Sequence, residues 1–280
     1  MTVPKHMRAF ALLFFAALFF SGCRQKSVTI AVIPRTCGTW LWEAEHTGVS
    51  RAAARYGLNV YWNAPTREND VQGQIDIFTR QLDRRARGII LSPVETLPLR
   101  SPTLEALRRG TPVVIVGTNL GLTPGKNLAY VLNDEQVGGQ LAARRMGKIL
   151  HGRGEIAILG ICQQLSSSTE RFLSLESTLA KEFPHIHVIF RSLSRPAIPD
   201  EQQVVERLLS KEHAIDGIIA LSETSTRGAF YAMTEFNRTK SIFLIGFDQA
   251  ILAPIRIGDI DSVIVQNTYR MGESRHAQNG

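Results

Sequence analysis

The feature that most constrains the fold is a repeated order of short apolar runs, polar turns and amphipathic segments, which begins at Ser27. Ten such runs occur in the order Val28–Ile33, Leu58–Trp62, Gly88–Leu91, Pro112–Val116, Leu128–Leu132, Glu155–Leu159, His187–Phe190, Gly217–Leu221, Ser241–Ile245 and Ser262–Val265. Several of them, such as Ile89-Ile90-Leu91, lack the alternation of a half-exposed strand, so they predict strands buried on both faces. The segments between them carry apolar residues at helical spacing. This order predicts an α/β fold built on doubly wound parallel sheets.

The domain organisation follows from the number of strands. Ten strands are many for one open sheet, and a fresh strand and helix series starts around Asn133-Asp134. We therefore expect an N-terminal lobe over 28–133 and a C-terminal lobe over 134–266, with 267–280 returning to the first lobe. No long linker separates the halves, so the lobes should share a ligand cleft. In such sheets ligands bind beyond the carboxyl ends of the strands.

The N-terminus has the layout of a secretion signal. A weakly basic start leads into the apolar run Ala9–Phe20, which is too short to span a bilayer as a stable helix. The residues Leu18 to Cys23 resemble a bacterial lipoprotein cleavage site, so we expect 1–22 to be a signal peptide. Cys23 would carry the lipids, and 23–27 would form a short tether to the membrane. An uncleaved anchor and an ordinary signal peptide with an incidental cysteine are the alternatives, and in each case the chain is expected in the periplasm or at the cell surface.

Motifs of common catalytic and cofactor sites are missing from the sequence. It has no Gly-rich phosphate loop, no Gly-x-Ser-x-Gly elbow, no His-Glu-x-x-His and no paired-glycine dinucleotide fingerprint. The net charge is +7, but basic residues gather near predicted helix ends, where they complement the helix dipole. Beyond Cys23, only Cys37 and Cys162 remain, too few for a disulfide framework. We expect no enzyme, no cofactor, no metal site and no nucleic-acid partner.

Eight segments, found in one order over about 28–272, resemble the ribose-type sugar-binding proteins of ABC importers, a periplasmic binding protein family related to the ligand-binding cores of LacI-type repressors. These segments are Thr29–Ile33, Gly88–Val94, Gly110–Val114, Asn133-Asp134 before Gly138-Gly139, Thr169–Arg171, Ile215–Gly217, Ile245–Asp248, and Val265–Asn267 before Met271-Gly272. The resemblance implies a type I periplasmic binding protein fold, a monosaccharide or modified sugar as the ligand, and an ABC permease as the partner. A sensor that presents a bound sugar or signal molecule to a membrane receptor would use the same core and is the alternative.

The resemblance also implies ligand-binding residues. Trp42 would lay its indole against the apolar face of a sugar, or else be a core residue of the first helix. Arg171 would donate forked hydrogen bonds from a helix that Ser167 caps, or else lie on a solvated helix face. Asp248 would accept sugar hydroxyls, or else cap the next helix. Gln266 matches an amide that both donates and accepts.

Five further positions modify this expectation. Ser92 and Ser222 stand where the family often has asparagine, and either could be a strand-end cap instead. Thr118 belongs to a Gly-Thr pair where the family commonly has Asp-Arg. Arg35 occupies a position that is usually small, and Thr39 one that is often asparagine. These changes alter both hydrogen bonding and charge, so they favour a modified or anionic sugar over a standard pentose.

The C-terminal segment departs from the family. Relatives continue after the Met-Gly pair with an amphipathic helix, whereas here Met271-Gly272 is followed by Glu-Ser-Arg-His-Ala-Gln-Asn-Gly, which has a single apolar residue. Such a segment cannot cover a sheet face. We therefore expect a C-terminally truncated member whose first lobe keeps an exposed apolar strip.

Lipidation of Cys23 gives a direct test of the N-terminal interpretation. Radiolabelled fatty acid should enter the wild-type protein and should not enter Cys23→Ser, because the thiol is the attachment atom. Cys37→Ser serves as the matched control and should label like wild type. Equal labelling of wild type and Cys23→Ser would refute the lipid anchor.

Overall fold

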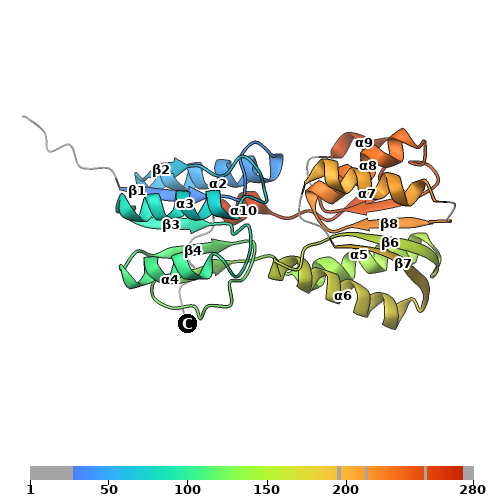
Figure 1. The fold of residues 1–280 in the computed structure, drawn as a ribbon, viewed down its shortest axis with the longest axis horizontal. Helices are drawn as coiled ribbons and strands as arrows, with labels where there is room; N and C mark the ends of the chain where they lie inside the picture. Colours follow the sequence, from blue (N-terminus) through green and yellow to red (C-terminus); the bar gives the residue numbers. More distant parts are fainter. Residues whose placement is uncertain (1–27, 194–196, 212–213, 249–250, 274–280) are drawn as a thin grey trace, which may run out of the picture.

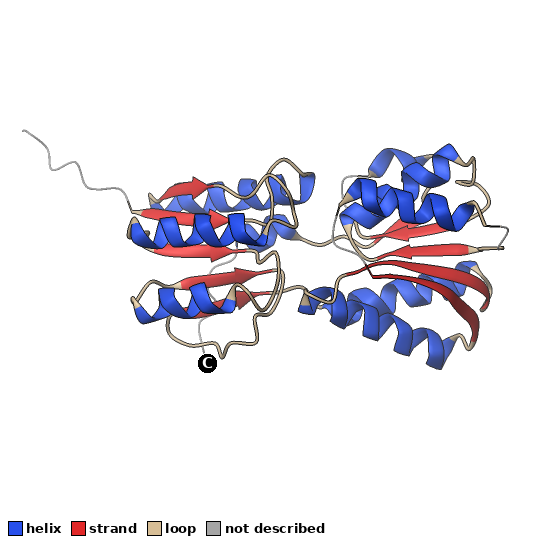
Figure 2. Ribbon diagram, in the orientation of Figure 1, coloured by secondary structure: helices blue, strands red, loops and turns tan. Residues whose placement is uncertain are grey.

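The computed structural model describes residues 28–193, 197–211, 214–248 and 251–273. They form two α/β lobes side by side, each with a five-stranded sheet and helices on both faces (Figures 1 and 2). Every strand pairing within the two sheets is parallel. Each of the ten apolar runs overlaps one strand, and the parallel sheets confirm the predicted fold class. Cys23 and the signal segment lie outside the described residues.

The first lobe has the strand order β2-β1-β3-β4-β5. Its strands are β1 (Thr29–Ile33), β2 (Asn59–Trp62), β3 (Gly88–Leu91), β4 (Val113–Val116) and β5 (Leu128–Val131). Helices α3 (Val71–Asp83) and α4 (Arg100–Arg108) bury their apolar side chains against one face of this sheet. On the other side, α2 (Trp40–Tyr56) packs against α10 (Thr268–Glu273).

The second lobe repeats the design with the order β10-β9-β8-β6-β7. Its strands are β6 (Arg153–Ile161), β7 (His185–Leu193), β8 (Gly217–Ala220), β9 (Phe243–Gly246) and β10 (Ser262–Val263). Helices α5 (Glu135–Ile149) and α6 (Ser166–Glu182) pack against each other. Helices α7 (Ile198–Leu209) and α8 (Glu223–Glu235) form a second pair, and α9 (Leu252–Arg256) is short. Both β6 and β7 are longer than their apolar runs, since they pair from Arg153 and His185 at one end to Ile161 and Leu193 at the other, across two register shifts.

Two crossings join the lobes within the described part of the chain. Residues 132–134 lead from β5 to α5, and residues 264–267 lead from β10 back to α10 (Figure 1). There α10 lies against α2, where Arg51 donates a hydrogen bond to the Tyr269 hydroxyl at 2.8 Å. Met271 is buried in this contact region. The segment 274–280, on which the truncation hypothesis rests, lies outside the described residues.

Side-chain caps set where several helices begin. Asp70 and Asp134 accept hydrogen bonds from the backbone N–H groups of Gly73 and Val137, each at 2.9 Å, and so begin α3 and α5. These bonds satisfy amides that have no partner inside the helix. Among the described helices, none is long and apolar enough to cross a membrane.

Close packing of α5 on α6 depends on a glycine. A Cβ atom at Gly139 would lie 2.3 Å from the Arg171 carbonyl oxygen and 2.9 Å from the Leu175 nitrogen. Both neighbours are backbone atoms, so they cannot rotate away. The two helices therefore approach this closely because position 139 has no side chain, and this approach fixes the helix that carries Arg171.

Replacement of this glycine gives a test of the fold. Gly139→Ala should lower the free energy of unfolding by about 1–3 kcal/mol, the usual cost of overpacking, because α6 must shift. Gly125→Ala is the matched control: its Cβ would meet nothing within 4 Å, so its stability should stay within about 0.5 kcal/mol of wild type. Urea unfolding monitored by circular dichroism measures both variants. Equal stability of the two would contradict the close approach of α5 and α6.

Candidate functional site

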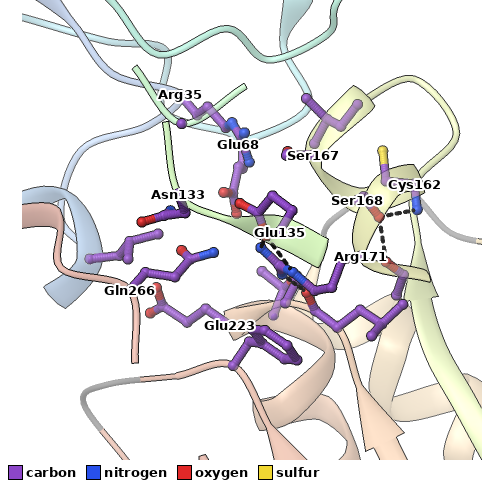
Figure 3. Close-up of a pocket in the computed structure, with 18 of the residues that line it drawn as sticks. Arg35, Glu68, Asn133, Glu135, Cys162, Ser167, Ser168, Arg171, Glu223 and Gln266 are labelled. Atoms are coloured by element: carbon purple, nitrogen blue, oxygen red, sulfur yellow. Dashed lines mark hydrogen bonds and ion pairs between the residues drawn. The ribbon is translucent and has the colours of Figure 1, made fainter. Parts of the chain in front are cut away.

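A pocket lies where the loops after the strands of both lobes meet. It holds about 830 Å³ of space free of protein atoms, including its open mouth. Its walls come from the loop after β1, the start of α2, the β2–α3 loop and the end of β4 in the first lobe, and from the loops after β6, β8 and β9 in the second. Both crossings also reach it, through Asn133 and Gln266 (Figure 3). The site is therefore at the carboxyl ends of the strands, as parallel sheets predict.

A buried amide fixes the first-lobe loops beneath this pocket. Gln74 of α3 donates to the carbonyl oxygens of Pro34 and Ser92 at 3.0 and 2.9 Å and accepts from the Val94 nitrogen at 2.8 Å. One side chain thus ties together the loops that follow β1 and β3. Arg35 rises from the first of these loops.

Trp42 and Arg35 form the first-lobe wall of the pocket. The Trp42 ring is 5% exposed, and the Arg35 guanidinium lies 5.6 Å from its centroid. The Nε of Arg35 donates to the Pro93 carbonyl oxygen at 2.9 Å, and burial lowers the pKa of this arginine. The indole N–H of Trp42 finds no hydrogen-bond acceptor among the described residues. A buried donor without a partner in the protein is unusual and marks a place for an acceptor on a ligand.

Arg171 lies in the second-lobe wall of the pocket, where protein groups already engage its guanidinium. Its Nε donates to Glu135 at 2.8 Å, its Nη2 pairs with the same carboxylate oxygen, and its Nη1 donates to the Leu221 carbonyl oxygen. Its guanidinium stacks 4.1 Å above the Phe247 ring centroid. Arg171 and Glu135 are both buried, so each charge needs the other. The second oxygen of Glu135 has no hydrogen-bond partner among the described residues.

The start of α6 differs from the expectation that Ser167 would cap it. The helix begins at Ser166, so its N-cap residue is Leu165, two residues before Ser167, and Leu165 makes no side-chain cap. The amides there find partners in the other lobe instead: the Ser167 nitrogen donates to the Thr118 hydroxyl at 3.3 Å, and the Ser166 nitrogen donates to Thr96 at 3.2 Å. The capping prediction was wrong because a residue distant in sequence satisfies these groups.

Thr118 therefore serves to join the lobes and does not line the pocket. Its hydroxyl lies 2.9 Å from that of Ser166, and Ser166 also accepts from the Asn119 nitrogen at 3.1 Å and donates to the Asn119 carbonyl oxygen at 2.9 Å. These bonds hold the two lobes together at the rim of the pocket.

Three further predicted residues are also outside the pocket lining. Asp248 accepts from Arg227 at 2.7 Å and is buried. The Ser92 hydroxyl donates to Glu45 at 3.3 Å, so it supports a lining residue from behind. Thr39 is at the N-cap position of α2, where its side chain makes no cap hydrogen bond. Their proposed contacts with a ligand stay predictions.

Two predicted residues complete the lining. Ser222 caps α8, since its hydroxyl accepts from the Ser225 nitrogen at 3.1 Å, and it also faces the pocket. The cap and the pocket position therefore coexist at this residue. Gln266 reaches the pocket from the second crossing (Figure 3).

The sequence reasoning missed a set of acidic residues. The lining contains the glutamates Glu45, Glu68, Glu135, Glu201 and Glu223. One signal was available: Glu45 lies three residues after Trp42, on the buried side of a helix where a charge is out of place. Glu135 and Glu223 each open a helix directly after a capping residue, where an acidic residue also suits the helix dipole, so their presence alone did not indicate a site.

Burial changes the acidity of these glutamates. It raises the pKa of Glu45 to about 7, against the opposing effects of the Ser92 hydrogen bond and Arg35. Burial, and then the nearby Asp248 carboxylate, raise the pKa of Glu223 to about 7 despite the charge of Arg227. Two arginines, Arg35 and Arg171, are the cations of the lining, against five glutamates. We therefore expect this excess of acidic groups to disfavour an anionic ligand, contrary to what Arg35 suggested in the sequence. Within the described residues, no group of three or more acidic, histidine or cysteine side chains could hold a metal ion.

Comparison with known proteins agrees with this geometry. The family model described as a periplasmic binding protein domain matches residues 30–275. The D-allose-binding periplasmic protein of Escherichia coli is 24% identical over 254 residues, which cover 86% of this chain and 80% of that protein. The xylitol-binding protein of Mycolicibacterium smegmatis is 25% identical over 79% of this chain and 62% of its own length.

A solved structure extends the comparison to the whole fold. The periplasmic component of an ABC-type sugar transport system from Hahella chejuensis superposes with a TM-score of 0.82, at 26% identity, over 88% of this chain and 90% of that one. The chain therefore belongs to the periplasmic binding protein domain family, as a solute-binding protein that acts outside the cytoplasm and is not an enzyme.

Proposed function

We propose that this protein captures a monosaccharide or a modified sugar between its lobes and delivers it to an ABC importer. The observation that carries the proposal is the pocket wall in which the buried indole of Trp42, with its unpartnered N–H, lies beside charged side chains. A sugar ring offers apolar C–H faces that suit an aromatic platform, and hydroxyls that suit carboxylates and a guanidinium. The allose- and xylitol-binding relatives support the same class of ligand.

Capture requires the lobes to close on the ligand. The bonds of Thr118 and Asn119 to Ser166 join the lobes at the rim of the pocket, and we assign them to the closed form. Closure about the two crossings buries the ligand and creates the shape that a permease would recognise.

The location of the protein forms part of the same proposal. We place it on the outer side of a membrane, tethered by lipids on Cys23 through residues 23–27. The small pair Ser21-Gly22 before Cys23 supports this tether. A tether keeps the binding protein close to its permease, which raises the effective concentration of one for the other.

Trp42 gives the first test of this proposal. A sugar that binds only the folded protein should raise its melting temperature in a thermal-shift screen. For such a sugar, Trp42→Phe should weaken binding by about 0.5–1.5 kcal/mol, roughly two- to tenfold, because the N–H donor is lost while the aromatic packing is kept. Trp40→Phe is the matched control, since Trp40 is 71% exposed and does not line the pocket. If no sugar shifts the melting temperature, the proposed function is wrong.

Ser166 gives a second test, which concerns closure. Ser166→Ala should weaken sugar binding by about 0.5–1.5 kcal/mol, because the closed form loses hydrogen bonds between the lobes. Ser174→Ala removes a hydroxyl of the same helix that bonds within one lobe, to the Gln136 carbonyl oxygen at 2.7 Å, and should leave the affinity unchanged. Isothermal titration calorimetry measures the affinities, and small-angle X-ray scattering measures the fraction of closed molecules. Identical affinities for the two variants would contradict a role of these bonds in closure.

A further inference from the structure

The charges around the pocket are unequal in number and in availability. Of the two arginines in the lining, Arg171 is fully engaged with Glu135, the Leu221 carbonyl oxygen and the Phe247 ring. Arg35 is therefore the cation of the lining that can compensate the glutamates of the first lobe. Its charge lowers the pKa of Glu45 and of Glu68, against the rise that burial causes. A neutral sugar would leave this excess of carboxylates in place.

Two of these carboxylates face each other from opposite lobes. Glu68 comes from the β2–α3 loop of the first lobe, and Glu223 is the first residue of α8 in the second. Both point into the pocket in Figure 3. They are close enough for the charge of Glu68 to raise the pKa of Glu223. Lobe closure therefore brings like charges together, which opposes closure unless a cation lies between them.

Arg227 does not supply that cation. It pairs with Glu223 at 3.0 Å, but it also pairs with Asp248 at 2.7 Å, so one guanidinium serves two carboxylates. It does not line the pocket. On the pocket side, Glu223 still faces the acidic Glu68.

A second observation points to a donor on the ligand. Glu135 is buried, and the oxygen that does not contact Arg171 accepts no hydrogen bond from the described residues. A carboxylate oxygen without a donor is costly to bury. An N–H or O–H group of a bound molecule would satisfy it.

We propose that the ligand is an amino sugar, whose protonated amine binds between Glu68 and Glu223 while its ring lies against Trp42. This inference rests on the proposed function and narrows its ligand class. The ammonium group supplies several N–H donors and a positive charge at the place where the two lobes bring acidic groups together. Binding of a cation there removes the repulsion that opposes closure, so the charge of the ligand and the closure of the lobes are coupled.

The pH dependence of binding follows from the groups around this position. Glu68, Glu45 and Arg35 face it from the first lobe, and Glu223, Glu135, Glu201 and Arg171 line it from the second. Arg227 and Asp248 lie behind Glu223. Glu223 and Glu45, each with a pKa of about 7, are protonated at about pH 5 and largely lose their charge there. The preference for an amine over its hydroxyl parent should therefore be smaller at about pH 5 than at about pH 7. Between these pH values, binding of the cation should release protons, because it favours the ionised form of these glutamates.

The experiment compares matched sugars on the purified protein by titration calorimetry. The pairs are D-glucosamine with D-glucose, D-galactosamine with D-galactose and D-mannosamine with D-mannose, together with the N-acetylated sugars and D-glucuronate. We expect at least one amino sugar to bind about tenfold more tightly than its hydroxyl parent, a difference of about 1.4 kcal/mol. N-acetylation, which removes the charge, should abolish this advantage.

Variants assign the effect to the two carboxylates. Glu223→Gln and Glu68→Gln should each reduce the ratio of amine to parent affinity, and melting curves confirm that both variants fold. Glu182→Gln is the matched control, because it removes one negative charge from an exposed ion pair with Arg144 on the same lobe as Glu223. It should leave the ratio unchanged.

The outcomes separate this inference from the function on which it rests. Equal or tighter binding of a hydroxyl parent, or tighter binding of D-glucuronate, overturns the amine assignment and leaves sugar capture standing. Absence of binding by every neutral, amino and acidic sugar overturns sugar capture itself. An amine preference that persists in both glutamine variants overturns the assignment to Glu68 and Glu223.

Discussion

Strands that pair in parallel and are buried on both faces must be connected by chain that passes over the sheet, and the geometry of the cleft follows from this requirement. Every connection leads from the carboxyl end of one strand back to the amino end of the next, so the carboxyl ends of all strands lie at one edge of the sheet. In this protein the two sheets direct these ends toward each other across the two crossings. Loops that are far apart in sequence thereby meet in one pocket, and helices such as α6 begin at its wall.

The architecture could be predicted from the sequence because each strand that is buried on both faces appears as a short apolar run, and these runs alternate with amphipathic segments. The family motifs led to Trp42 and Arg171, and both lie in the pocket lining. Asp248 was expected there as well, but Arg227, twenty-one residues away, binds it, and no local pattern reveals that pairing. The acidic character of the pocket was missed because Glu45 and its counterparts come from separate elements, and only the folded chain brings their charges together.

The buried pair of Arg171 and Glu135 shows how the second lobe keeps charges away from water. Each side chain is almost completely buried, and neither would be stable there alone. The pair links α5 to α6, the same two helices that approach closely at Gly139. The ion pair and the glycine thus support each other: close packing positions the guanidinium, and the guanidinium joins the beginnings of both helices. A wall built this way presents a fixed surface to whatever enters the pocket.

Each crossing between the lobes contributes one amide side chain to the pocket, Asn133 from 132–134 and Gln266 from 264–267. Points on a rotation axis move least, so these two amides keep nearly the same position whether the lobes are apart or together. In the proposed capture of a ligand, they would make its first hydrogen bonds, before closure brings either wall into contact with it. The rate of association would then depend on these two amides, whereas the lifetime of the closed complex would depend on the two walls.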